Sequence, residues 1–151
     1  MKYMGTSDVA YFATHGIASE DEPMKKSFLV LSGSDPFLTA KDIMDSRKKF
    51  YQFPGMVILS ACQTGLGKSM EVGVAGLARA FMLAGASHII MSLWNVDDEA
   101  TAYLMNRFMF HLQEPSLFMP AEQLRKALLD TRKKYSKPSQ WASFSLFGVD
   151  Y

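Results

Sequence analysis

Residues 56–65 read Met56-Val57-Ile58-Leu59-Ser60-Ala61-Cys62-Gln63-Thr64-Gly65, and the rest of the fold can be worked out from this stretch. Its first part, Met56–Leu59, is a continuous apolar run that predicts a buried strand, because a strand covered on both faces shows no alternation with polar residues. Its second half carries Cys62, the chain's only cysteine. The stretch therefore predicts a central strand that ends beside a single thiol.

A second apolar run, Val9–Ala13, ends in the same way on Thr14-His15-Gly16. Apolar runs and helical spacing elsewhere predict strands over residues 27–31, 88–94 and 142–147, and helices over residues 39–50, 74–84, 104–112 and 120–135. Buried strands that alternate with helices predict an α/β fold, a three-layer sandwich with a mainly parallel sheet. The length of 151 residues suits one domain, residues 1–151.

His15, Cys62 and the segment Asn95–Asp98 each follow a predicted strand. Because α/β proteins carry their sites beyond the carboxyl ends of parallel strands, we expect these residues to converge. A thiolate is a nucleophile, and a neighbouring imidazole can take up a proton and return it. The backbone N–H groups of Gly16 and Cys62 could bind the oxyanion of a tetrahedral intermediate. The pattern favours cysteine peptidase chemistry over the alternative, in which Cys62 is a buried packing residue.

Two acidic residues, Asp97 and Asp98, come directly before a predicted helix. Asp97 is predicted to cap that helix, because its side chain can accept from the free backbone N–H groups of the first turn. Asp98 is predicted to lie at the floor of a pocket and to pair with a basic side chain of a substrate.

Gly67-Lys68-Ser69 ends a stretch that approaches the phosphate-binding pattern G-x-x-x-x-G-K-[ST]. Cys62 stands at the position of the first glycine, which the phosphate loop needs so that its backbone can wrap the ligand. Nucleotide binding is therefore the weaker hypothesis for this segment.

The composition excludes several classes of protein. A net charge of +1 gives no basic excess for nucleic-acid binding. The three histidines and Cys62 lack the spacing of a zinc site, so we predict no metal site. No run reaches the ~18 apolar residues of a membrane span, and one cysteine cannot form an internal disulfide. These features predict a cytoplasmic protein that binds neither nucleic acid nor membrane.

Short segments spread along the chain agree with one family in sequence and in order. They are Ala13-Thr14-His15-Gly16, Leu38-Thr39-Ala40-Lys41-Asp42-Ile43, Leu59-Ser60-Ala61-Cys62-Gln63-Thr64-Gly65, Gly76-Leu77-Ala78-Arg79-Ala80-Phe81, Ala84-Gly85-Ala86, Ser92-Leu93-Trp94-Asn95-Val96-Asp97-Asp98-Glu99-Ala100-Thr101 and Trp141-Ala142-Ser143-Phe144. Together they resemble the CHAT domain, a family of caspase-like peptidase domains that is related to separases and often found beside tetratricopeptide repeats.

The resemblance implies a cysteine endopeptidase that cleaves protein substrates with a His–Cys dyad and needs no cofactor. His15 matches the family's catalytic histidine and Cys62 its nucleophile, while Gly16 and Cys62 match its oxyanion hole. Asp98 matches an aspartate that faces a basic P1 side chain in separase-like relatives. The segment 63–73 resembles a loop that is often mobile or regulatory in caspase-like enzymes.

Caspase-like domains normally begin with two strands and a helix that precede the histidine-bearing strand, whereas this sequence begins about eight residues before Val9. We therefore expect a fold truncated on its N-terminal side, in which Val9–Ala13 presents an unpaired apolar edge. Such an edge predicts self-association, or a partner segment that supplies the missing strands. The alternative function is a catalytically inactive caspase-like interaction module with an incomplete cleft.

Overall fold

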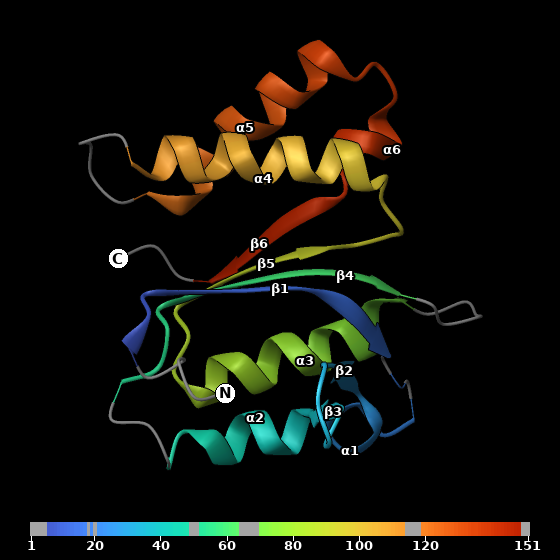
Figure 1. Ribbon diagram of the computed structural model, residues 1–151, viewed down its shortest axis with the longest axis vertical. Coiled ribbons are helices and arrows are strands. Elements are labelled where there is room, and N and C mark those ends of the chain that lie inside the picture. The colour runs from blue at the N-terminus through green and yellow to red at the C-terminus, as the bar shows by residue number, and fades with distance from the viewer. Residues whose placement is uncertain are drawn as a thin grey trace.

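The computed structural model describes residues 6–17, 19, 21–48, 52–63, 70–113 and 119–148, with the backbone alone for residues 23, 61–63 and 70–75. They form a six-stranded sheet between two layers of helices (Figure 1), which confirms the predicted three-layer α/β sandwich. The strands are β1 (Val9–Ile17), β2 (Phe28–Val30), β3 (Phe37–Thr39), β4 (Met56–Gln63), β5 (His88–Ser92) and β6 (Phe144–Gly148). The helices are α1 (Pro23–Lys26), α2 (Ala40–Ser46), α3 (Met70–Ala84), α4 (Asp98–Leu112), α5 (Pro120–Lys134) and α6 (Pro138–Trp141).

The strands lie in the order β3-β2-β1-β4-β5-β6 across the sheet. β1, β4 and β5 are parallel and form its centre. All five residues of β5 are buried, because helices cover both of its faces. β2, β3 and β6 run antiparallel to their neighbours, so the sheet is parallel at its centre and antiparallel toward both edges.

Helices α2 and α3 cover one face of the sheet, and α4 and α5 lie over the other (Figure 1). Successive residues of β4 divide between the two cores because side chains alternate along a strand. Val57 and Leu59 pack in the core with α2 and α3, which contains Phe81. Met56 and Ile58 pack in the core with α4 and α5.

The ends of the helices follow the local sequence signals. Thr39 and Asp42 form a capping box at the start of α2, in which the side chain of each accepts a 3.1 Å hydrogen bond from the backbone N–H of the other. Gly85 ends α3 with a φ of +124°, in the left-handed region that favours glycine. Pro120 is the first residue of α5, as predicted.

Several boundaries differ from the predictions. β1 and β4 each continue four residues past their predicted ends, because backbone pairing between the two strands persists after the apolar run stops. α3 begins at Met70, before the predicted residue 74, and α2 ends at Ser46, before the predicted residue 50. β3 and α1 were not predicted from the sequence.

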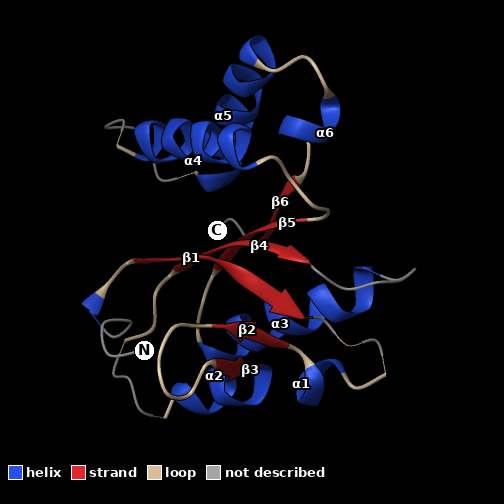
Figure 2. Cartoon of the chain, turned by 45° about the vertical axis from the view of Figure 1, so that its right-hand side comes forward, coloured by secondary structure: helices blue, strands red, loops and turns tan. Residues whose placement is uncertain are grey.

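The outer edge of β1 is covered in part. β2 pairs with residues 15–17 of β1 and then turns with β3 toward α1 and α2 (Figure 2). Among the described residues, no strand pairs with residues 9–14 on that side. Residues 9–14 contain the whole of the expected open edge, Val9–Ala13. Self-association through this edge stays a prediction.

Candidate active site

His15 and Cys62 are direct partners in the register of the parallel strands β1 and β4. Both lie inside their strands, near the carboxyl ends, and not beyond them as the sequence predicted. The imidazole of His15 is exposed. The thiol of Cys62 lies outside the described side chains. The fold thus brings together the backbones of two residues that are 47 positions apart in the sequence (62 − 15).

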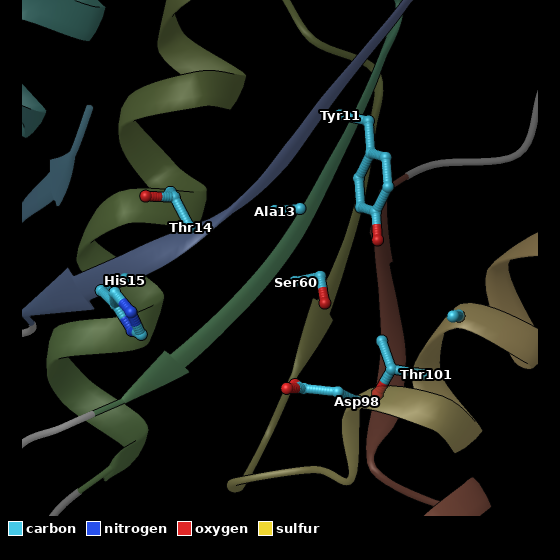
Figure 3. Close-up of a pocket in the computed structure, with 8 residues that line it drawn as sticks. Tyr11, Ala13, Thr14, His15, Ser60, Asp98 and Thr101 are labelled. Carbon is cyan, nitrogen blue, oxygen red and sulfur yellow. The ribbon is translucent and has the colours of Figure 1, made fainter. Parts of the chain in front are cut away.

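A cleft of about 310 Å³ opens beside His15, on the face of the sheet where α4 lies (Figure 3). Its walls come from β1, β4 and the first turn and a half of α4. The lining residues are Tyr11, Ala13, Thr14, His15, Ser60, Asp98, Thr101 and Ala102. Two residues that the sequence assigned to one site, His15 and Asp98, therefore line one cleft.

The connection between β5 and α4 holds Asp98 in place. Asp97 Oδ1 accepts a 2.9 Å hydrogen bond from the backbone N–H of Ala100, which confirms Asp97 as the cap of α4. Trp94 Nε1 donates to the carbonyl of Ser139 at 3.1 Å, so this connection is tied to α6. Asp98 begins the helix, where the helix dipole favours a negative charge, and its carboxylate points into the cleft (Figure 3).

Tyr11 and Ser60 are lining residues that the sequence did not indicate as functional. The Tyr11 side chain is 50% exposed, and its hydroxyl points into the cleft toward Ser60 and Asp98 (Figure 3). Tyr11 belongs to the apolar run that predicted a buried strand, so its sequence context carried no signal of exposure.

The end of β1 is held between two strands. Thr14 Oγ1 donates a short hydrogen bond to the carbonyl of Val30 in β2. Gly16, predicted to contribute to the oxyanion hole, is buried and lies in register with Leu29 on one side and Gln63 on the other.

An ion cluster lies farther along α4, where it packs against α5. Asp130 Oδ2 accepts from Arg107 Nε at 2.9 Å and from Arg107 Nη2 at 2.8 Å, and His111 Nε2 lies 3.0 Å away. Lys133 Nζ donates to Asp130 Oδ1 at 3.1 Å. His111 first, then Arg107 and Lys133, hold the pKa of the Asp130 carboxyl well below its ordinary value. His111 therefore helps to join α4 to α5.

The structure also bears on the phosphate-loop, metal and membrane hypotheses. Lys68 of the weak phosphate-loop hypothesis lies outside the described residues. Within the part of the chain that is described, no three His, Cys, Asp or Glu side chains group to hold a metal ion. The helices in that part are also too short or too polar to cross a membrane.

The mixed α/β sandwich, with its cleft at the carboxyl ends of two parallel strands, is consistent with the caspase-like class. The family model of the CHAT domain matches residues 2–149, and the chain belongs to that family.

Two relatives show the extent of the similarity. The chain is 33% identical over 114 residues to tetratricopeptide repeat protein 28 of Homo sapiens, and 31% identical over 113 residues to the protein of that name from Mus musculus. Each match covers 75% of this chain and 4% of the relative. The chain therefore corresponds to a small part of these much longer proteins.

Proposed function

We propose that this CHAT domain is a cysteine endopeptidase in which Cys62 is the nucleophile and His15 the general acid–base. The observation that supports the proposal best is the register of β1 and β4, in which His15 and Cys62 are direct partners beside a cleft. Neighbouring strands lie about 5 Å apart, so side chains that leave the same face at paired positions are within reach of each other, as an imidazole and a thiol must be. Membership of the CHAT family supports the same assignment.

In this proposal the Cys62 thiolate attacks the carbonyl carbon of a peptide bond, and the C–N bond then breaks. His15 takes the thiol proton and delivers it to the leaving amine. The acyl group remains on the sulfur until water, deprotonated by His15, releases it as a carboxylic acid. Backbone N–H groups of Gly16 and Cys62 stabilise the oxyanion at each addition step.

Within the proposal, Asp98 indicates which class of substrate side chain the cleft accepts. Its carboxylate lies on the wall opposite β1, and among the residues that the structure describes no Lys or Arg lines the cleft. An anionic wall favours a cationic side chain, so we expect cleavage after a basic residue.

The first test uses the fact that Cys62 is the chain's only cysteine, so that alkylation reports on this thiol alone. We expect iodoacetamide to modify Cys62 near pH 7 faster than it modifies a free thiol, because a paired imidazole increases the thiolate fraction. His15→Ala should slow the reaction, whereas Ile17→Ala, at an exposed position of the same strand, should not. A rate equal to that of a free thiol, unchanged by His15→Ala, would contradict the dyad.

The second test is turnover of fluorogenic peptides that differ at P1. Cys62→Ala should reduce turnover to background, and His15→Ala should reduce it by about 10²–10⁴-fold. A reactive thiol without turnover of any peptide would favour the alternative, an interaction module that retains the dyad.

A further inference from the structure

We propose that an apolar face of β2 and β3 binds the leaving-group half of the peptide substrate, and that the site therefore prefers large apolar residues at P2′ and P3′. This β2–β3 face consists of the side chains of Phe28, Val30 and Phe37. The inference rests on the proposed function for the reaction. It goes further by naming a second surface, which contacts the peptide on the other side of the scissile bond from Asp98.

The β2–β3 face continues a row of side chains that begins at His15. In the register of the sheet His15 pairs with Val30, and Val30 pairs with Phe37. Paired residues on neighbouring strands project from the same face of a sheet, and the strands lie about 4.8 Å apart. The three side chains therefore form one row across β1, β2 and β3, which starts at the general acid–base of the proposed reaction.

Helices cover the opposite face of these strands. Leu29 and Leu38 are buried in the core with α2 and α3. Phe28 and Val30 are half-buried, Phe37 is 52% exposed, and none of these three packs in either core of the described residues. The rings of Phe28 and Phe37 meet edge to face, with centroids 4.9 Å apart. An exposed apolar cluster beside a cleft is typical of a binding surface.

The direction of the scissile bond leads the leaving half of the peptide onto this face. In the proposed reaction Cys62 on β4 bonds the carbonyl carbon, and His15 on β1 protonates the amine nitrogen, so the bond points from β4 toward β1. β2 and β3 are the next strands in that direction (Figure 2). The acyl half lies on the other side, where Asp98 and the start of α4 line the cleft.

The spacing of the row fits the second and third residues of the leaving half. Successive Cα atoms of a peptide are about 3.8 Å apart. An extended chain that begins within about 3 Å of the His15 imidazole brings P2′ over Val30 and P3′ over Phe37, roughly 5 and 10 Å from His15.

The chemistry of the β2–β3 face selects among residues at these two positions. Valine and phenylalanine side chains carry no polar atoms, so a leucine that is placed against them gains free energy by burial. A serine or aspartate would lose hydration there without a hydrogen-bond partner. The face therefore favours large apolar residues in the leaving half.

The first test compares internally quenched peptides that differ only in the leaving half. Each peptide has arginine at P1 and glycine at P1′, followed by two leucines or two serines at P2′ and P3′. We expect kcat/KM to be about tenfold higher for the leucine peptide, because partial burial of two leucine side chains stabilises the bound peptide.

Variants of the face then locate this preference. Phe37→Ser should reduce it to about twofold, and Val30→Thr, which keeps the shape and strand preference of valine, should reduce it to about fivefold. Phe110→Ser should leave it unchanged. Phe110 is a matched control because it is 54% exposed and lies on α4, about 18 Å along the helix from Asp98. Thermal melts report whether each variant remains folded.

A second test measures binding without catalysis. The Cys62→Ala protein is titrated with the leaving half alone, as glycyl-leucyl-leucyl-glycinamide or glycyl-seryl-seryl-glycinamide, and NMR chemical shifts report binding. The leucine peptide should shift the amide signals of Val30 and Phe37, and the serine peptide should bind at least about fivefold more weakly. Sedimentation velocity of the protein and of Phe37→Ser tests whether a second copy occupies the face.

Equal turnover of the two quenched peptides, or a preference that neither Phe37→Ser nor Val30→Thr reduces, would overturn the inference and leave the peptidase proposal. Binding of the leucine peptide by a protein that turns over no peptide would overturn the peptidase proposal and leave the β2–β3 face as a peptide-binding surface. A dimer that Phe37→Ser dissociates would show that the face binds a second copy, which also overturns the inference. Neither binding nor turnover would overturn both proposals.

Discussion

The two faces of β1 differ in how helices cover them. On one face Ala10 and Phe12 pack against the core beneath α2 and α3. On the other face Val9 reaches the core with α4 and α5, but Tyr11, Ala13 and His15 are exposed along the cleft. β5 shows the usual outcome for a central strand, since all of its residues are buried.

This difference indicates how the fold makes room for a site. A face that helices cover only in part leaves some side chains free to meet a ligand, while the opposite face supplies the stability that keeps the strand in place. We therefore expect changes on the covered face to alter folding, and changes on the open face to alter binding and catalysis.

The largest expected effect is on the covered face. Phe81 is fully buried, and its ring contacts Phe12 and Phe53, with centroids 5.5 and 6.4 Å away. Phe81→Ala should lower the free energy of unfolding by about 3–5 kcal/mol, because it leaves a cavity. Tyr11→Ala on the open face should change it by less than about 1 kcal/mol. Urea unfolding measures both values.

Phe81→Leu serves as the control, since it keeps most of the apolar volume and should cost less than the change to alanine. Similar losses of unfolding free energy for Phe81→Ala and Tyr11→Ala would contradict this prediction. They would show that the two faces of β1 contribute equally to stability.

The next effect concerns the ion cluster that joins α4 to α5. The pKa of Asp130 is lowered in the folded state, so the carboxylate stabilises the fold above its unfolded pKa of about 4. That contribution is lost as the pH falls through the lowered pKa, with onset below about pH 5. Asp130→Asn should cost about 2 kcal/mol at pH 7 and should flatten this acid dependence.

Hydrogen exchange at pH 3 and pH 7, corrected for intrinsic rates, would locate the effect. Amides of α4 and α5 should lose protection on acidification before those of the described part of α3. Loss of protection in α3 first would mean that the cluster does not decide the acid stability of the α4–α5 layer.

The smallest expected effect on stability concerns two helix caps, Thr39 and Asp97. Thr39→Ala and Asp97→Ala should each cost about 1 kcal/mol of unfolding free energy, since each removes a side chain that accepts from a backbone N–H. Only Asp97→Ala should also weaken binding of a cationic ligand, because Asp98 is the next residue. Asp97→Asn keeps a capping side chain, so its stability and its affinity for the ligand should stay close to those of the unmodified protein. Equal ligand affinity in Thr39→Ala and Asp97→Ala would show that the cap at Asp97 does not position Asp98 for binding.

Local signals in the sequence predicted much of this fold. The capping box before α2, the glycine after α3 and the proline that opens α5 can be recognised in the sequence, because each depends on neighbours within a few residues. The strand β3 was missed because its three residues carry too short a pattern to distinguish a strand from a turn. The ends of β1 and β4 were placed too early, because strand pairing, and not side-chain polarity, decides where a strand ends.

The sequence by itself determined the alternation of strands and helices, the parallel centre of the sheet, and the identities of the single thiol and its candidate partner histidine. These follow from hydrophobic patterning and residue chemistry, which are local. Only the tertiary structure decided that His15 and Asp98 line one cleft, that Tyr11 is exposed beside them, and that β2 covers no more than residues 15–17 of the edge of β1. The physical reason is that exposure depends on where helices from distant parts of the chain come to lie, and a pattern within one strand does not record it.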